Sequence, residues 1–195
     1  MWQSQNWRCI LDEQKEAGDW KPMAKISHNS VAIAGEFAVL SQLALRGFDA
    51  NMTLGNTKSV DILVADPLTG KMFKIEVKTH YGHRPSRSKL FGHTLDWIMS
   101  EKHERIIASS LFYIFVSIAT EANSFRFFIV PSGVVAKYMR EQHEYWLAIN
   151  EMHRDNPVRR FRIGLDEQGY ALPTPLAKDY ENKWDFHLSE PIHAQ

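Results

Sequence analysis

The sequence predicts a mixed α/β fold in which helices flank one central mixed sheet. Three observations indicate this class. Two segments carry the start and stop residues of helices, several short segments alternate apolar and polar residues with a period of two, and the two kinds of segment interleave along the chain. The expected order at the centre of the fold is a helix, three strands, a second helix and a further strand.

The first helix is expected over residues 31–46. This segment is rich in Ala and Leu and contains no Pro, Ser27 or Asn29 precedes it as the N-cap, and Gly47 follows it as a stop residue. A strand is expected next, over 48–54, because Phe, Ala, Met and Leu alternate there with Asp, Asn and Thr.

Two further strands are expected on either side of a hairpin. A turn over 55–58 leads into a strand over 60–65, and Pro67 and Gly70 fit turn positions before a third strand over 72–79. A polar segment follows. The rest of the chain predicts a helix, two strands, a helix and a strand, over 94–108, 112–119, 125–130, 131–149 and 159–163, respectively.

The composition is that of one globular domain. The 195 residues include 23 Lys plus Arg and 23 Asp plus Glu, so the formal net charge is zero, which argues against binding nucleic acid through bulk charge alone. The one cysteine, Cys9, excludes an intrachain disulfide and a zinc site of the CxxC kind. Residues 1–25 lack the apolar core of a signal peptide, and the longest apolar run, 111–119, is too short to span a membrane. A cytoplasmic protein is therefore expected.

Charged residues within two expected strands indicate a candidate site. Glu76 and Lys78 share one face of the third strand, and Asp61 is a carboxylate within the otherwise apolar second strand. The hairpin would bring Asp61 near Glu76 across the ladder. Adjacent carboxylates repel, and Lys78 would offset the repulsion in part. A hard divalent ion bound by Asp61, Glu76 and the carbonyl of Val77 would offset it better. The alternative is that Glu76 and Lys78 form the solvated face of an edge strand.

A third carboxylate, Glu36, lies on or beside the apolar side of the first helix. The helical rotation of about 100° per residue gives it Leu40 and Leu43 as angular neighbours. A buried carboxylate needs a partner, and the same metal or Lys78 would supply one. If the helix phase differs by one residue, Glu36 is a surface residue instead.

Together, Glu36, Asp61 and the run Glu76, Val77 and Lys78 resemble the motif of the PD-(D/E)XK nuclease superfamily, which includes restriction endonucleases and Holliday-junction resolvases. The resemblance implies a restriction-endonuclease-like fold and Mg²⁺-dependent hydrolysis of DNA phosphodiester bonds. It implies that Glu36, Asp61 and Glu76 bind Mg²⁺, as one or two ions and with Mn²⁺ as a substitute. Lys78 would then position or activate the attacking water.

The resemblance covers about residues 30–135 and suggests a division of the chain. Residues 28–150 would form the PD-(D/E)XK-like nuclease core, 1–27 an N-terminal arm or helix, and 151–195 a C-terminal extension packed on the core. One departure from the motif is Val60, which stands where the motif has a Pro before the Asp.

A basic segment after the third strand is expected to contact DNA phosphates. Residues 79–95 contain no Asp or Glu, and Arg84, Arg87, Lys89 and His80 are interleaved there with aromatic residues. A flexible, solvated loop is the alternative. DNA is the expected partner, with RNA left open as a second substrate and a homodimer expected if both strands of a duplex are cut. The alternative function is a non-catalytic nucleic-acid-binding or interaction module on the same fold.

Overall fold

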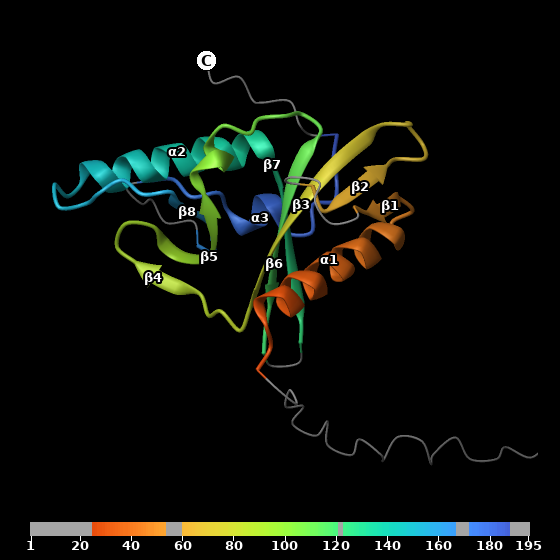
Figure 1. The fold of residues 1–195 in the computed structure, drawn as a ribbon, viewed down its shortest axis with the longest axis horizontal. Helices are drawn as coiled ribbons and strands as arrows, with labels where there is room; N and C mark the ends of the chain where they lie inside the picture. Colours follow the sequence, from red (N-terminus) through yellow and green to blue (C-terminus); the bar gives the residue numbers. More distant parts are fainter. Residues whose placement is uncertain (1–24, 54–59, 121–122, 167–171, 188–195) are drawn as a thin grey trace, which may run out of the picture.

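A computed structural model describes residues 25–53, 60–120, 123–166 and 172–187. Within these ranges the chain forms two sheets, two long helices and two short helical segments (Figure 1). The turn expected over 55–58 lies outside the described residues, as does all of the expected N-terminal arm except residues 25–27.

The main sheet has five strands in the order β1-β2-β3-β6-β7. β3 and β6 run parallel, and the other neighbours run antiparallel, so the prediction of a mixed sheet is confirmed. The strands are β1 (Asp49–Met52), β2 (Ile62–Ala65), β3 (Met72–Tyr81), β6 (Leu111–Ile118) and β7 (Phe125–Pro131).

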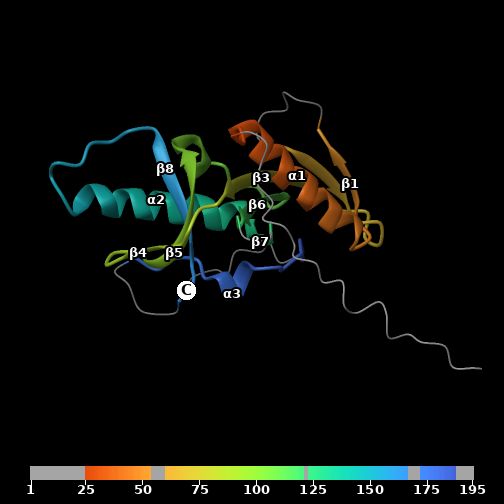
Figure 2. The same cartoon turned by 90° about the horizontal axis from the view of Figure 1, so that it is seen from below.

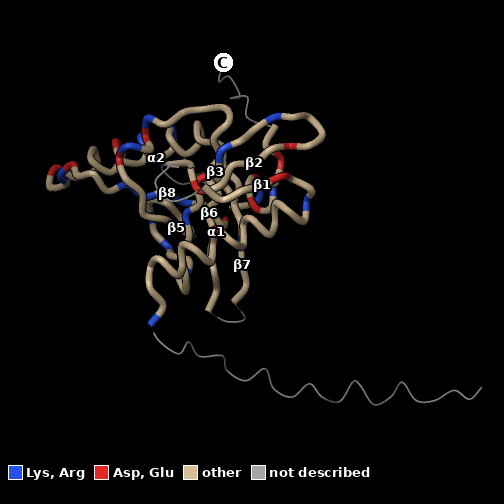
Figure 3. The backbone as a smooth tube through the Cα atoms, turned by 45° about the vertical axis from the view of Figure 1, so that its right-hand side comes forward, with Lys and Arg blue, Asp and Glu red and all other residues tan. Residues whose placement is uncertain are grey.

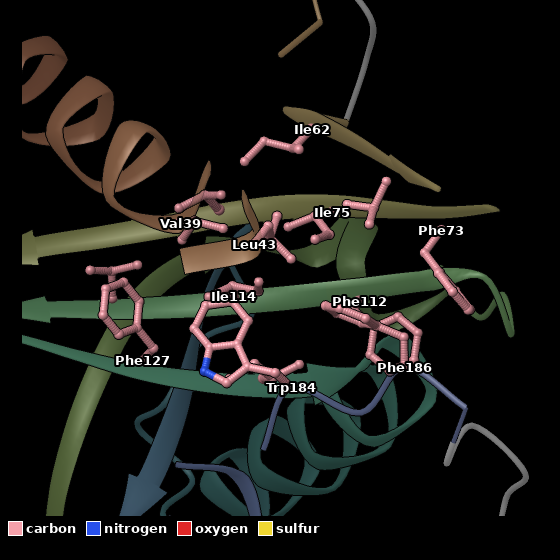
Figure 4. Close-up of a cluster of buried hydrophobic side chains, with 14 of the residues drawn as sticks. Val39, Leu43, Ile62, Phe73, Ile75, Phe112, Ile114, Phe127, Trp184 and Phe186 are labelled. Atoms are coloured by element: carbon pink, nitrogen blue, oxygen red, sulfur yellow. The ribbon is translucent and has the colours of Figure 1, made fainter. Parts of the chain in front are cut away.

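Helix α1 (His28–Ala44) covers one face of this sheet. It begins at Ser27, whose hydroxyl accepts the Ser30 N–H at 3.0 Å, in agreement with the expected N-cap. Val39 and Leu43 are fully buried from α1, and they pack with apolar side chains of β2, β3 and β6 (Figure 4). This contact fixes α1 against the central strands.

Helix α2 (Ser132–Ala148) covers the opposite face together with a second, three-stranded sheet in the order β4-β5-β8 (Figure 2). Its strands are β4 (Ser86–Ser88), β5 (Gly92–Ser100) and β8 (Val158–Gly164). Phe161 of β8 stacks on Phe115 of the main sheet, with 4.2 Å between ring centroids. The two sheets and α2 therefore share one apolar core.

The prediction of a helix over 94–108 is wrong, and with it the expected order of helix, three strands, helix and strand. The segment forms β5 and then a short 3-10 helix, η1 (Glu101–Glu104). The apolar Leu95, Trp97 and Met99 alternate along the strand and are buried, Ile98 is 66% exposed, and the polar Thr94 and Asp96 are also buried. Pairing along its length with β8 stabilises the strand, and that partner lies about sixty residues away in sequence.

Downstream of β5, the expected elements are confirmed with small shifts at their ends. β6, β7, α2 and β8 occupy the places predicted for two strands, a helix and a strand. After β8 comes a four-residue helix, α3 (Ala177–Tyr180), and then Trp184 and Phe186, which insert into the core beneath α1 (Figure 4). No helix in the described ranges is both long enough and apolar enough to cross a membrane.

Candidate active site at the edge of the main sheet

The candidate site lies where β3 runs on past the start of β2. The pairing of β2 with β3 ends at Ile62 and Ile75, whereas β3 continues alongside β6 as far as Tyr81. The Asp61 N–H donates to the Ile75 carbonyl at 2.8 Å, although Ile75 is already paired with Ile62. Two residues facing one is the geometry of a β-bulge, a feature that redirects a side chain at the end of a ladder.

The bulge directs the Asp61 carboxylate along the edge of β3. Its Oδ2 accepts the Val77 N–H at 2.7 Å, which satisfies a backbone donor that β2 no longer reaches. Asp61 is half-buried there. The sequence predicts Asp61 near Glu76 across the ladder; in the structure the Asp61 carboxylate contacts the backbone N–H of the next residue, Val77.

Glu76 and Lys78 point to the face of the main sheet that is covered by α2 and the three-stranded sheet. Glu76 is 3% exposed, and its Oε1 receives both Lys78 Nζ at 2.6 Å and His103 Nε2 at 3.1 Å. The other oxygen, Oε2, is buried and has no hydrogen-bond partner. The alternative in which Glu76 is a solvated surface charge is therefore wrong.

Helix α1 places Glu36 near enough to Asp61 and Lys78 to interact with their charges. A Cβ added to Gly35 would lie 1.8 Å from Thr79 Oγ1, so only glycine allows α1 to approach β3 this closely. Glu36 follows directly and is half-buried. Burial and the charge of Asp61 raise the pKa of Glu36, and Lys78 partly opposes them. Glu36 is thus an electrostatic neighbour of both Asp61 and Lys78.

The carboxylates fall into two groups by the direction in which the fold shifts their pKa. Burial raises the pKa of Asp61 in spite of the Val77 N–H and Lys78, and the charge of Glu76 adds to the increase. Burial would raise the pKa of Glu76 as well, but His103 and Lys78 outweigh it and lower that pKa to about 2. Glu76 is therefore ionised, while ionisation of Asp61 and Glu36 is disfavoured. A nearby cation would relieve that penalty.

The donor atoms suit a hard divalent cation. They are carboxylate oxygens, including the orphaned Oε2 of Glu76, together with the predicted carbonyl ligand of Val77. Among the described residues, however, no three His, Cys, Asp or Glu side chains are grouped closely enough to hold a metal ion. The residues thus fit a cation by chemistry and charge, and the ligand set of Glu36, Asp61, Glu76 and Val77 stays a prediction.

The segment expected as a basic loop is largely ordered as strand. It forms the end of β3, β4 and the start of β5, which pairs antiparallel with β4. Arg87 and Lys89 are exposed on this hairpin and Arg84 is exposed in the connection just before it, as phosphate contacts would require. Arg87 is 74% exposed, with its guanidinium 4.0 Å from Asp166.

His80 lies between the site and the small sheet. Its Nδ1 is 3.2 Å from the Asp96 carbonyl, and its ring stacks on Trp97 with 4.6 Å between centroids. Burial and the neighbouring His83 lower the pKa of His80 to about 4. The imidazole is therefore neutral at pH 7, so His80 would contact a nucleic acid as a neutral hydrogen-bonding group and not as a cation.

His103 is the site residue that sequence reasoning missed. It is 3% exposed and lies in η1, within the segment expected to be helical. It lies 27 residues beyond Glu76, and only the tertiary fold brings them together. The alternation of Leu95, Trp97 and Met99 was the available signal, since it would have ended the expected helix before His103.

No protein-family model matches the chain, and no curated protein sequence matches it. Among solved structures, the chain is similar to a bacterial homing endonuclease, I-Ssp6803I. The similarity covers 81% of this chain and 88% of that chain, with 14% sequence identity and a TM-score of 0.42. A similarity of this size assigns neither a family nor an activity, so the function proposed below rests on the chain's own residues.

Proposed function

We propose that this chain is a metal-dependent endonuclease that hydrolyses phosphodiester bonds in DNA, with Mg²⁺ as its cofactor and Mn²⁺ as a substitute. The observation that carries the proposal is the convergence of Asp61, Glu76 and Lys78 at the open edge of β3, with Glu36 brought into the same field by α1. Glu76 and Lys78 form an ion pair there, and Asp61 has a raised pKa.

The residues divide the work by position. Glu36, Asp61, Glu76 and the carbonyl of Val77 would hold the metal. When bound, a divalent ion supplies a water of lowered pKa and charge compensation for the phosphate.

Lys78 is the residue whose positive charge is proposed to act on the attacking water or on the phosphate. Its side chain is 29% exposed while its ammonium group contacts the buried Glu76, so part of Lys78 is accessible from solvent. From there it would orient the attacking water or stabilise negative charge on the phosphate. The PD-(D/E)XK resemblance suggests the same role for this lysine.

DNA would be bound by a local group of basic side chains and not through the overall charge of the chain. The chain is neutral overall, and the described acidic and basic residues are interspersed along the backbone without separating onto two faces (Figure 3). The proposed phosphate contacts are the exposed side chains of Arg87 and Lys89 on the β4–β5 hairpin and of Arg84 just before it. A homodimer and activity on RNA are further expectations, to be checked by ultracentrifugation and with RNA substrates.

The test is cleavage of plasmid, single-stranded and branched DNA by the purified chain with Mg²⁺, Mn²⁺ or EDTA. We expect cleavage with either metal and none with EDTA, and a loss of two to three orders of magnitude in Lys78→Met and Glu76→Gln. Lys74→Met is the matched control, because Lys74 is an exposed lysine on the same face of β3. Full activity of the Lys78 and Glu76 variants would contradict the proposal.

Two observations favour the second candidate, a non-catalytic nucleic-acid-binding module. Lys78 Nζ lies 2.6 Å from the oxygen of Glu76 that His103 also contacts, and the described residues hold no three-ligand metal group. A structural ion pair would account for both facts. This candidate predicts DNA retention without cleavage and no metal-dependent rise in the melting temperature.

A further inference from the structure

We propose that His103 is a positioning residue, which holds Glu76 so that Oε1 faces Lys78 and His103 and Oε2 alone is left for a ligand such as a divalent metal. The inference rests on the proposed nuclease function. It assigns a role to a residue that is far from Glu76 in sequence.

The geometry divides the two oxygens of one carboxylate. His103 Nε2 is 3.1 Å from Oε1 and Lys78 Nζ is 2.6 Å from the same atom, so both donors converge on one side. Oε2 is equally buried and has no partner. Leaving a buried carboxylate oxygen unpaired is costly, and such atoms in a site call for a ligand.

The contact holds in either charge state of the ring. A carboxylate only accepts, so Nε2 must carry the hydrogen. Nδ1 lies 2.9 Å from the Ser100 carbonyl and 3.2 Å from the Ser100 hydroxyl. A protonated ring donates to the carbonyl and a neutral ring accepts from the hydroxyl, and both leave Nε2–H directed at Glu76.

His103 is itself fixed, because η1 is tied to elements on both sides. The Glu101 N–H donates to the Pro157 carbonyl at 3.0 Å, just before β8. Arg140 of α2 donates through Nη1 to the Glu104 carbonyl at 2.7 Å, and the Glu104 side chain pairs with Arg159, which is 5% exposed. These contacts fix the position of the His103 ring relative to β3.

Tyr113 encloses Glu76 on the remaining side. It is the partner of Glu76 in the parallel register of β3 and β6, it is fully buried, and its ring centroid lies 5.8 Å from that of His103. Its hydroxyl is buried without a hydrogen-bond partner of ordinary geometry, and burial, the charge of Glu76 and hydrogen bonding toward that carboxylate raise its pKa. Glu76 thus lies between two buried rings, and of the two it is His103 that hydrogen-bonds Oε1.

The test is the affinity of the full chain for Mn²⁺ alone, by titration calorimetry. Residues that orient metal ligands typically change affinity by 10- to 100-fold, so we expect His103→Leu to weaken binding by about that factor. His103→Gln keeps an N–H donor near the place of Nε2 and should stay within about threefold of wild type. His187→Leu is the matched control, because His187 Nε2 makes the same contact, at 3.0 Å, with Asp66 at the far end of the hairpin.

Two further readouts distinguish positioning from general stability. In plasmid cleavage, His103→Leu should lower kcat and leave KM for DNA unchanged, because the phosphate contacts lie on the β4–β5 hairpin. Tyr113→Phe removes the other buried polar group beside Glu76 and should bind Mn²⁺ like wild type. If the leucine variant fails to fold, by circular dichroism, the glutamine variant and His103→Asn, which lacks a donor at the Nε2 position, provide the comparison.

The outcomes separate this inference from the function on which it rests. If wild type binds Mn²⁺ and cuts DNA, Glu76→Gln abolishes both, and His103→Leu binds within twofold of wild type, the positioning role is overturned while the nuclease stands. Equal losses in Tyr113→Phe and His103→Leu would also overturn it. If wild type neither binds Mn²⁺ nor cuts DNA, the proposed function fails, and the inference fails with it.

Discussion

Glu76 is a buried carboxylate whose charge is held by two donors, and this makes part of the stability depend on pH. Burial alone would raise its pKa, but His103 and Lys78 lower it from 4.5 to about 2. Because the folded pKa lies below the unfolded value, the stabilisation is fully present above pH 4.5. It is lost as the pH falls from 4.5 through about 2.

We therefore expect Glu76→Gln to remove an acid-sensitive part of the stability. A decrease of this size corresponds to about 3 kcal/mol, which wild type should lose across that window and the variant should not. Urea unfolding at pH 6 and at about pH 2 measures the difference, because at pH 3 only part of the stabilisation is lost. Glu141→Gln is the control, because the Glu141 side chain lies on the exposed side of α2. Equal losses in wild type and Glu76→Gln would show that the pair with His103 and Lys78 does not stabilise the fold.

Residues of the site were predictable to the extent that their surroundings are local. Asp61, Glu76 and Lys78 stand out because charged residues interrupt apolar strands with a period of two. His103 does not, because its contact with Glu76 depends on where β5 turns into η1. The bulge at Asp61 was equally hidden, since it depends on which carbonyl of β3 accepts the Asp61 N–H.

Among the elements, α1 depends on one glycine for its distance from β3. A Cβ at Gly35 would lie 1.8 Å from Thr79 Oγ1 and 2.8 Å from Thr79 Cβ, so the helix or the strand would have to move. Overpacking of this kind costs about 1–3 kcal/mol. The move would also displace Glu36 from Asp61 and Lys78.

We expect Gly35→Ala to lower the free energy of unfolding by about 1–3 kcal/mol and to reduce cleavage further than the lost stability explains. Gly133→Ala is the matched control, because the nearest atom to a Cβ there is at 3.8 Å, an ordinary contact, and the change should be neutral or stabilising. Thr79→Gly should partly rescue Gly35→Ala. A Gly35→Ala protein as stable and active as wild type would contradict the close approach.

The hairpin of β4 and β5 is the element proposed to contact DNA. If Arg87 and Lys89 each contact one phosphate, Arg87→Ala and Lys89→Ala should each lower affinity and reduce the slope of log K against log salt by about 1. Lys137→Ala, on α2 with a 65% exposed side chain, should change neither. Fluorescence anisotropy across a salt series measures both quantities, and an unchanged slope would remove the hairpin from the interface.

Elements were predictable where their signals are contained in one segment. α1 has a Ser N-cap and Gly47 at a φ of +82° after its end, and β3, β6 and α2 follow their own apolar patterns. β5 was mistaken for a helix because its pairing partner, β8, follows about sixty residues later. Non-local pairing determines a strand's conformation, and a short window of sequence does not contain it.

At the scale of the whole molecule, the zero net charge indicates that DNA binding should depend on a bound cation and not on bulk attraction. The chain has 23 basic and 23 acidic residues, so no bulk attraction draws it to DNA. Two of the acidic residues are unfavourable in their charged form: burial and the charge of Asp61 raise the pKa of Glu36, and burial and the charge of Glu76 raise the pKa of Asp61. A bound cation would remove that repulsion and the obstacle it presents to a phosphate.

Stability should therefore respond to metal through Asp61. Burial raises its pKa above 3.8, so its charge destabilises the metal-free fold increasingly as the pH rises above that value. Asp61→Asn removes the charge and keeps an oxygen for the Val77 N–H. At pH 7 without metal, we expect this variant to melt at a higher temperature than wild type.

Mn²⁺ at about 100 times its Kd should stabilise wild type by about 2.7 kcal/mol, or raise its melting temperature by roughly 5–10 °C. The Asn variant should not respond, whereas Lys74→Met should respond like wild type. Scanning calorimetry with and without Mn²⁺ measures these shifts, and a metal response retained by Asp61→Asn would place the ion elsewhere in the molecule.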